Sequence, residues 1–285
     1  MNRAGAPTFQ LGIDFWSFHN SLEAHQMTIF DYFAVIHSYG FTCAQYNPLK
    51  EIYSGCGWKY IDDQKKYLED HHLVPVIIDF RSLISPHLTD ADLDPLKERL
   101  ESAACLSAQL VSGVLTETSH QDMRSFGGNR PAMIDCAIEN LGRVGELARQ
   151  WNLKYLIENH GDFTAAEFAL IMSRVQSPSI GMTFDTGNQV EVFEDPYLAA
   201  QTIAPLSEVV HYKNYGFEIT HFGGLLFGTP LQDGLLDMTR INAIIRESSS
   251  GMVNVNIEVA CQEASQELLF VESYVDFLRK EFLCR

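Results

Sequence analysis

Eight apolar segments recur along this chain of 285 residues, and a helical or polar stretch follows each of them. Residues 74–80 are apolar almost throughout, as expected of a strand that is buried on both faces. The predicted strands are residues 9–15, 41–46, 74–80, 110–115, 154–158, 180–185, 208–212 and 253–258. Strand and helix alternate eight times without a linker or a change in composition, which predicts an α/β fold: a single (β/α)8 TIM barrel over residues 1–285.

Helical periodicity and capping residues mark the segments between these strands. Thr164 is followed three residues later by Glu167, a capping-box pattern, and Pro131 suits the first turn of a helix. The predicted helices are residues 28–39, 59–72, 90–109, 131–151, 237–247 and 265–282, with two more that begin at 164 and 195. Polar residues and paired glycines at 116–129 predict a long loop, and the glycines between 216 and 234 predict a long flexible one.

The main alternative to a barrel is an open, doubly wound parallel sheet. A glycine-rich turn directly after the first strand usually marks that fold. Here the first strand runs instead into Asp14-Phe-Trp-Ser-Phe-His19, which contains no glycine. The alternation of elements therefore favours the barrel.

Composition excludes several classes of protein. A hydrophobic share of 46% is too high for a disordered chain, and a net charge of −17 repels phosphate backbones and anionic lipids. We therefore expect neither a nucleic-acid partner nor a membrane partner. The six cysteines follow no disulfide or zinc spacing, and residues 1–7 lack the apolar core of a signal peptide, so we expect a cytoplasmic protein. The sequence leaves open whether the chain forms a homo-oligomer.

Four adjacent predicted strands deliver metal-type ligands at their carboxyl ends: Glu158, Asp185, His211 and Glu258. A single acid at a strand end is often a helix cap or one member of an ion pair. Three buried acids at one barrel mouth would repel each other unless a cation joined them. This oxygen-rich set predicts one divalent metal ion, with Mn2+ or Mg2+ preferred and Co2+ or Zn2+ able to substitute.

Several motifs in the carboxyl half resemble those of the xylose-isomerase-like barrel superfamily, and more narrowly its sugar isomerase and epimerase members. They are Ile157-Glu158-Asn159-His160, Phe184-Asp185-Thr186-Gly187-Asn188, His211-Tyr212-Lys213-Asn214, Ile257-Glu258 and Leu231-Gln-Asp-Gly-Leu-Leu-Asp237. The resemblance implies that the four ligands bind one ion, which grips a carbonyl and a neighbouring hydroxyl of a sugar or cyclitol. It also implies that Glu158 and Glu258 are catalytic and exchange a proton with opposite faces of the substrate through an enediolate.

Two positions depart from the pattern of the epimerases. Asn188 stands where these enzymes often have histidine, and Asn214 stands where an aspartate usually follows the lysine. Asparagine can hydrogen-bond a hydroxyl but cannot act as a base at neutral pH. These changes leave the metal ligands intact and the exact reaction open.

Five further residues are candidates for substrate binding: Trp16, Arg81, His160, Asn188 and Lys213. Each has an alternative interpretation. Trp16 could form an apolar wall with Phe15 and Tyr46, or these rings could simply pack in the core. Arg81 could hold an acidic substrate group, or it could form an ion pair with Asp79 or Glu117.

The leading prediction is therefore a metal-dependent isomerase or epimerase that acts on a small carbohydrate. The first alternative is a lyase (dehydratase, decarboxylase or eliminase) on a keto-sugar or ketoinositol, since it begins with the same proton abstraction at the same metal. An apurinic-site endonuclease shares the barrel but needs a basic surface, and the net charge argues against it. A non-catalytic sugar-binding barrel is the remaining alternative.

Overall fold

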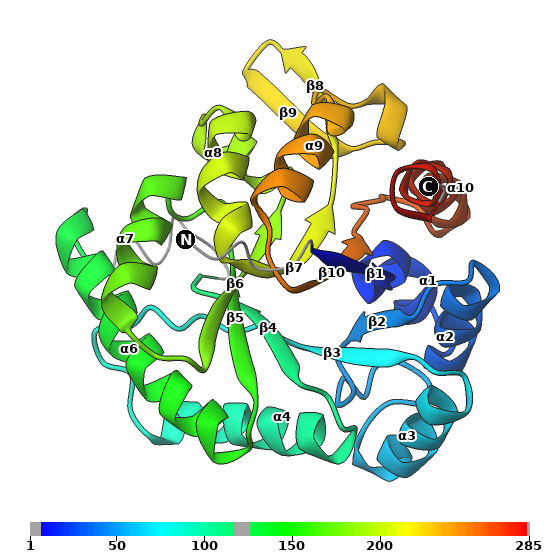
Figure 1. The fold of residues 1–285 in the computed structure, drawn as a ribbon, viewed down its shortest axis with the longest axis horizontal. Coiled ribbons are helices and arrows are strands. Elements are labelled where there is room, and N and C mark those ends of the chain that lie inside the picture. Colours follow the sequence, from blue (N-terminus) through cyan, green and yellow to red (C-terminus); the bar gives the residue numbers. More distant parts are fainter. Residues whose placement is uncertain (1–6, 117–125, 284–285) are drawn as a thin grey trace.

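Eight parallel strands close into a barrel at the centre of the molecule (Figure 1). The structure is a computed structural model that describes residues 7–116 and 126–283. Around the barrel the strands follow the order β1-β10-β7-β6-β5-β4-β3-β2. Their bounds are β1 Thr8–Asp14, β2 Cys43–Tyr46, β3 Val74–Asp79, β4 Leu110–Val114, β5 Lys154–Glu158, β6 Ile180–Asp185, β7 Ser207–Tyr212 and β10 Met252–Ile257. The barrel prediction is confirmed, and each predicted strand overlaps an observed one.

Helices surround this barrel on its outer side (Figure 1). They are α1 His19–Glu23, α2 Ile29–Ser38, α3 Ile61–Asp70, α4 Asp94–Cys105, α6 Arg130–Gln150, α7 Ala165–Val175, α8 Pro196–Ile203, α9 Met238–Ser248 and α10 Ala264–Leu278. The predicted capping box before α7 is present, because Thr164 caps the backbone of Glu167 and the Glu167 side chain accepts from the Thr164 backbone. The short helix α1 was not predicted.

Successive strand residues point alternately outward to the helices and inward to the barrel axis. The outward residues join the helices in one large apolar core, to which Ile77, Tyr155 and Phe184 belong. The inward residues form a much smaller apolar cluster of Cys43, Val76, Leu156 and Val209. Beyond this cluster the inward positions become polar towards the carboxyl ends of the strands. The apolar packing therefore holds the barrel together and leaves its mouth free for other chemistry.

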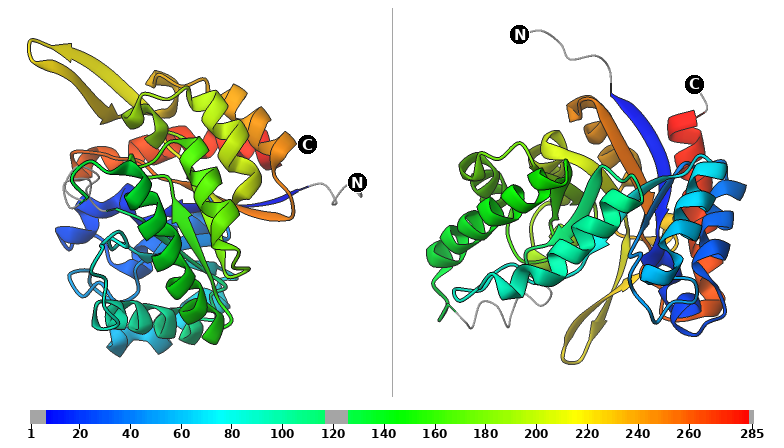
Figure 2. Two further views of the ribbon diagram at one scale, coloured as in Figure 1. Left: turned by 90° about the vertical axis from the view of Figure 1, so that its left-hand side faces the viewer. Right: turned by 90° about the horizontal axis from the view of Figure 1, so that it is seen from below.

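An antiparallel hairpin, β8 Tyr215–Thr220 and β9 Gly223–Gly228, occupies the segment for which a flexible loop was predicted. That prediction is wrong, because β-forming residues such as Phe217 and Ile219 alternate between the glycines. Gly224 is needed for packing: a Cβ atom there would lie 2.1 Å from the ring of Phe217. The hairpin projects from the body of the barrel (Figure 2).

Two other expectations can be compared only with the part of the chain that the structure describes. Residues 117–125, most of the long loop predicted at 116–129, lie outside the described residues. Within the described ranges 7–116 and 126–283, no helix has the length and apolar character that crossing a membrane requires.

Candidate metal centre

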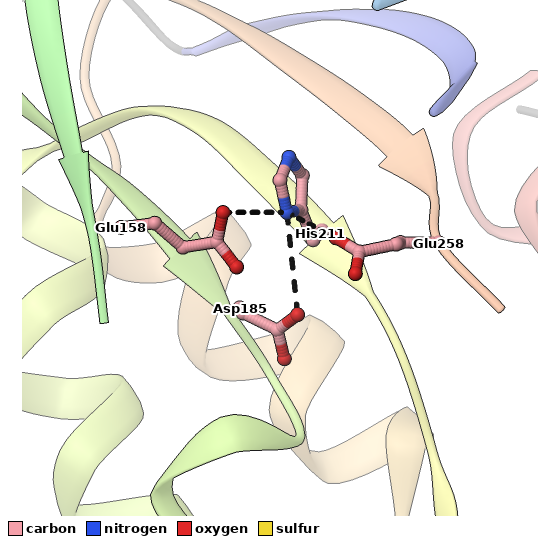
Figure 3. Close-up of side chains that lie close together, drawn as sticks. All are labelled: Glu158, Asp185, His211 and Glu258. Atoms are coloured by element: carbon pink, nitrogen blue, oxygen red, sulfur yellow. Dashed lines mark ion pairs between the residues drawn. The ribbon is translucent and has the colours of Figure 1, made fainter. Parts of the chain in front are cut away.

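The four predicted ligands converge at the carboxyl-terminal mouth of the barrel (Figure 3). Glu158 ends β5, Asp185 ends β6, His211 is the penultimate residue of β7, and Glu258 directly follows β10. These strands are neighbours in the barrel, so their ends meet at one place. One potential ligand atom from each of the four side chains lies within 4.8 Å of the others. The structure thus brings together all four residues that the strand-end pattern singled out.

The imidazole of His211 lies between the three carboxylates (Figure 3). Its Nδ1 atom is 2.6 Å from Glu258 Oε2, 3.5 Å from Glu158 Oε2 and 4.0 Å from Asp185 Oδ2. The side chains of all four residues are at most 10% exposed to solvent. Three negative charges are therefore buried around one imidazole, and so many like charges need nearby cations to be stable.

Lys213 supplies part of the missing positive charge. Its Nζ atom lies 2.6 Å from Glu258 Oε1 and 2.9 Å from Asp185 Oδ2, and the side chain is buried. Asp14 lies 4.0 Å from the same imidazole, and burial raises its pKa well above its usual value, so its protonated form adds no charge. With His211 neutral, as a metal ligand must be, three carboxylates and one ammonium then leave two negative charges. A divalent cation would balance them.

The hydrogen bonds around the ligands leave suitable atoms for such an ion. Asp185 Oδ1 accepts from the backbone N–H groups of Gly187 (2.7 Å) and Asn188 (3.0 Å). Glu158 Oε1 accepts from Asn188 Nδ2 (3.1 Å). Asp185 Oδ2 and His211 Nδ1 are both buried, and their partners belong to the same cluster: Lys213 Nζ lies 2.9 Å from the first atom and Glu258 Oε2 lies 2.6 Å from the second. This oxygen-rich set, in which three carboxylates share one imidazole and one ammonium, fits a hard divalent ion.

Burial and charge shift the pKa values of two ligands in opposite directions. Burial raises the pKa of Asp185 to about 6, although Lys213 acts against it. Burial also raises the pKa of Glu258, but Lys213 and His211 outweigh it and hold that pKa well below its usual value. The cluster therefore takes up a proton on Asp185 more readily than on Glu258.

A cavity of about 600 Å3 opens above the cluster, and both polar and apolar residues line it. Four of the five predicted substrate-binding residues line it together with three ligands: Trp16, His160, Asn188 and Lys213 beside Glu158, His211 and Glu258. Phe15, Ile78 and Phe80 form apolar parts of its wall. His160 packs edge-on against Phe80, with the ring centroids 5.2 Å apart. Tyr46, the third ring of the suggested wall, is fully buried and packs on Phe33 instead.

Arg81 lies elsewhere. Its guanidinium binds Asp79, with Nε 2.7 Å from Oδ1 and 2.6 Å from Oδ2. Asp79 also accepts from the Tyr155 hydroxyl at 2.8 Å, and Arg99 Nε lies 3.9 Å away. Arg81 is not among the described residues that line the cavity. The ion pair with Asp79 is thus present, Glu117 lies outside the described residues, and a substrate contact for Arg81 stays a prediction.

Asn214, one of the two departures from the epimerase pattern, stabilises the chain after β7. Its Nδ2 atom donates to the carbonyl groups of Leu231 (3.0 Å) and Leu236 (3.1 Å). Its Oδ1 atom accepts from the backbone N–H groups of Tyr215 and Leu236, both at 3.0 Å. Its four hydrogen bonds hold the hairpin to the segment before α9.

Sequence reasoning missed three buried polar residues that line the cavity, Asp14, Gln45 and Ser112. Asp14 ends β1, so the strand-end rule that found Glu158 could have found it as well. Burial, followed by the charge of Glu258, raises the pKa of Asp14 well above its usual value. Gln45 carries no such signal, since a neutral amide in a strand is not a typical metal ligand.

The molecule is thus a parallel (β/α)8 barrel with an acidic candidate metal site at its carboxyl-terminal mouth. Residues 33–280 match the family model described as xylose isomerase-like TIM barrel, so the chain belongs to that family. No curated protein sequence matches the chain significantly.

Solved structures with the same fold include the following three. The probable 3-DHS dehydratase AsbF of Bacillus anthracis is 16% identical (TM-score 0.66; 94% of this chain and 98% of that chain covered). An IolI protein with a bound zinc atom is 13% identical (TM-score 0.67; 96% and 99%). A D-psicose 3-epimerase of Clostridium cellulolyticum H10, solved with D-tagatose, is also 13% identical (TM-score 0.67; 96% and 99%). At these identities the likeness concerns the fold.

Proposed function

We propose that this protein is a divalent-metal-dependent isomerase or epimerase acting on a sugar, keto-sugar or cyclitol. One observation carries the proposal: three buried carboxylates and one imidazole converge at the barrel mouth, where Glu158, His211 and Glu258 line a cavity large enough for a small carbohydrate. Barrels of the same fold include an epimerase solved with a ketose and a protein with bound zinc, which supports this choice.

Glu158, Asp185, His211 and Glu258 would hold the ion, for which Mn2+ is our first choice and Mg2+ the second. When bound, the ion supplies positive charge to a substrate carbonyl oxygen and so makes the neighbouring C–H group more acidic. Lys213, 2.6 Å from Glu258, adds a fixed positive charge at the same floor. Burial raises the pKa of Glu258, but Lys213 and His211 outweigh burial and hold that pKa well below its usual value, so this carboxylate is ionised, which is the form that binds a cation.

Glu158 and Glu258 lie on opposite sides of His211 in the cluster (Figure 3). In the proposed reaction one of them, in its ionised form, takes a proton from carbon and leaves an enediolate, and the other, in its protonated form, gives its proton to complete the reaction. Exchange of protons with solvent then restores both carboxyl groups to their starting forms. Asn188 steadies Glu158 through the 3.1 Å hydrogen bond from its amide. The apolar wall of Phe15, Trp16 and Phe80 would pack against the carbon face of the substrate and restrict water.

A lyase is the second candidate. Asn188 cannot supply the proton that a histidine could at the same position, and one barrel with the same fold is a probable dehydratase. The first proton abstraction would be the same, but the intermediate would then lose water or carbon dioxide.

A substrate panel distinguishes these candidates. Purified protein with Mn2+ is incubated with ketoses, keto-acids and inosose, and the products are analysed by mass spectrometry and chromatography. A new product of unchanged mass supports the isomerase or epimerase, and loss of water or carbon dioxide shows a lyase. Samples treated with a chelator and the Glu158→Gln variant serve as controls. No turnover, together with no effect of Mn2+ on the melting temperature, would contradict the proposed function and favour a non-catalytic sugar-binding barrel.

A further inference from the structure

A buried chain of two amides lies behind the imidazole of His211, on the side away from the carboxylates. Gln45 on β2 and Asn256 on β10 are both fully buried. Gln45 Nε2 lies 2.7 Å from His211 Nε2, and Gln45 Oε1 accepts from Asn256 Nδ2 at 2.5 Å. The proposed reaction makes no use of either amide, so their burial at the centre of the barrel calls for another explanation.

The two amides can meet because β1, which lies between β10 and β2, has a glycine at the position where the Asn256 side chain passes over it. Gly12 is in register with Asn256 on one side and with Cys43 on the other. A Cβ atom on Gly12 would lie 2.3 Å from Asn256 Oδ1. The missing side chain leaves the space in which Asn256 reaches across β1 towards Gln45.

The present orientation of the two amides is compatible with only one tautomer of His211. With the Gln45 nitrogen towards it, His211 Nε2 must accept a hydrogen bond, so the imidazole proton lies on Nδ1. Nδ1 is the atom that faces the three carboxylates, and it cannot bind a metal ion while it carries a proton. Both the metal-bound imidazole and the imidazolium instead carry a proton on Nε2, which then needs an acceptor.

Gln45 can provide that acceptor if its carboxamide turns over. Oε1 then faces His211 Nε2, and the amide nitrogen faces Asn256, which must turn as well to present its own oxygen. A carboxamide keeps its shape when it turns, so no repacking is needed. Asp14, the other described polar group close to His211 Nε2, has its oxygen 4.0 Å away, beyond hydrogen-bond distance.

The side-chain oxygen of Asn256 favours the arrangement in which both amides have turned. In the present orientation Asn256 Oδ1 is buried, and no N–H or O–H group of the described residues donates to it; the Cys43 thiol, a weak donor, is hydrogen-bonded to this side chain. After turning, this oxygen would accept from Gln45, and the Asn256 nitrogen would face the Cys43 carbonyl. On turning, this nitrogen takes the place that Asn256 Oδ1 occupies now. That place is next to Cys43 O, because Asn256 Oδ1 and Cys43 O both lie within 2.3 Å of the position that a Cβ atom on Gly12 would have. The turned chain therefore removes an unsatisfied buried polar group.

We infer that Gln45 is the positioning residue of the metal centre: its side-chain oxygen accepts a hydrogen bond from His211 Nε2–H, with Asn256 as its support. This hydrogen bond fixes the tautomer in which Nδ1 can bind a divalent ion. The inference rests on the proposed metal site and adds to it a residue that is not a ligand, contributed by the opposite half of the barrel.

Metal binding by substituted proteins tests this inference. Gln45→Met keeps the length of the side chain but removes the acceptor, and Gln45→Glu keeps an acceptor in either orientation. The matched control is Gln64→Met, since Gln64 is equally buried but bonds to the Tyr46 hydroxyl and to the backbone carbonyl groups of Pro48 and Gly55. The dissociation constant for Mn2+ is measured by titration calorimetry, and unfolding by urea is followed in the same samples.

We expect Gln45→Met to bind Mn2+ about 10- to 100-fold more weakly than the unsubstituted protein. Gln64→Met should lose stability but keep the dissociation constant, and Gln45→Glu should bind Mn2+ at least as tightly as the unsubstituted protein. Equal affinity in Gln45→Met and the unsubstituted protein would overturn the inference. If Gln45→Met does not fold, more than tenfold weaker binding by folded Gln45→Glu would overturn it instead. An unsubstituted protein that binds no divalent ion would refute the proposed metal site itself, and with it this inference.

Discussion

Two buried charged clusters lie at the carboxyl ends of the strands, one outside the barrel wall and one inside it. Outside, Asp79 is surrounded by Arg81, Arg99 and the Tyr155 hydroxyl, so one acid has two cations and a hydrogen-bond donor nearby. Inside, Glu158, Asp185 and Glu258 share Lys213 and one imidazole. The outer cluster has enough positive charge from protein side chains, whereas the inner one has too little.

The balance between positive and negative side chains distinguishes a structural ion pair from a candidate functional site better than burial does. Both clusters are buried, both contain strand-end acids, and both would have been selected by a search for carboxylates after apolar runs. Among the described residues, Glu158, His211 and Glu258 of the inner cluster line the cavity described above, whereas Asp79, Arg81 and Arg99 of the outer cluster do not. An excess of buried negative charge points to a missing cation.

The largest expected effect is on the inner cluster. Glu158→Gln removes a ligand and a proton carrier, so turnover of the substrate found in the panel should fall by a factor of about 10²–10⁴ or be lost. Mn2+ binding measured by calorimetry should weaken as well. Full activity in this variant would rule out the proposed role of Glu158.

Asp79→Asn applies the same isosteric change to the outer cluster. Because Arg81 and Arg99 would lose their buried carboxylate partner, we expect the free energy of unfolding to fall by about 3 kcal/mol in urea titrations. Mn2+ affinity should stay the same, since Asp79 does not line the cavity and its partners Arg81, Arg99 and Tyr155 are not candidate ligands. A variant that keeps its stability but loses the metal would reverse the roles assigned to the two clusters.

Mn2+ itself should stabilise the protein through the inner cluster. At a free Mn2+ concentration about 100 times the dissociation constant, linkage predicts roughly 2.7 kcal/mol of added stability. Thermal unfolding should therefore shift upward by several degrees, in Asp79→Asn as in the unsubstituted protein, and a chelator should reverse the shift. An equal shift in Glu158→Gln would place the ion at another site.

The smallest effect concerns pH. Burial raises the pKa of Asp185 to about 6, so below this pH the carboxyl is protonated and an ion must displace the proton. The Mn2+ dissociation constant should therefore rise by up to about tenfold per pH unit below pH 6 through Asp185 alone. His211 must also lose a proton to bind the ion; burial lowers its pKa, but the carboxylates of Glu158 and Glu258 outweigh burial and raise that pKa well above its usual value, so the affinity should still increase with pH above 6. Titrations between pH 5 and 8 would show this. A constant affinity across that range would mean that Asp185 is not a ligand.

Local patterns in the sequence predicted much of the fold and the four candidate ligands. Apolar runs of strand length identified all eight barrel strands, and the residue at the end of each run identified Glu158, Asp185, His211 and Glu258. The hairpin was missed because its glycines suggested a loop, although the alternating Phe217 and Ile219 already indicated strands. Asp14 was within reach of the strand-end rule.

Other features depend on which residues become neighbours when the barrel closes. Arg81 follows a strand end just as the ligands do, but only the structure shows its guanidinium on Asp79, outside the barrel wall. Gln45 and His211 are 166 residues apart and come into contact inside the closed barrel, where Gly12 gives Asn256 room to join them. A strand's own sequence determines which of its residues point inward, because side chains alternate along a strand. The partners that those residues meet are decided across the barrel, by contacts that no local pattern encodes.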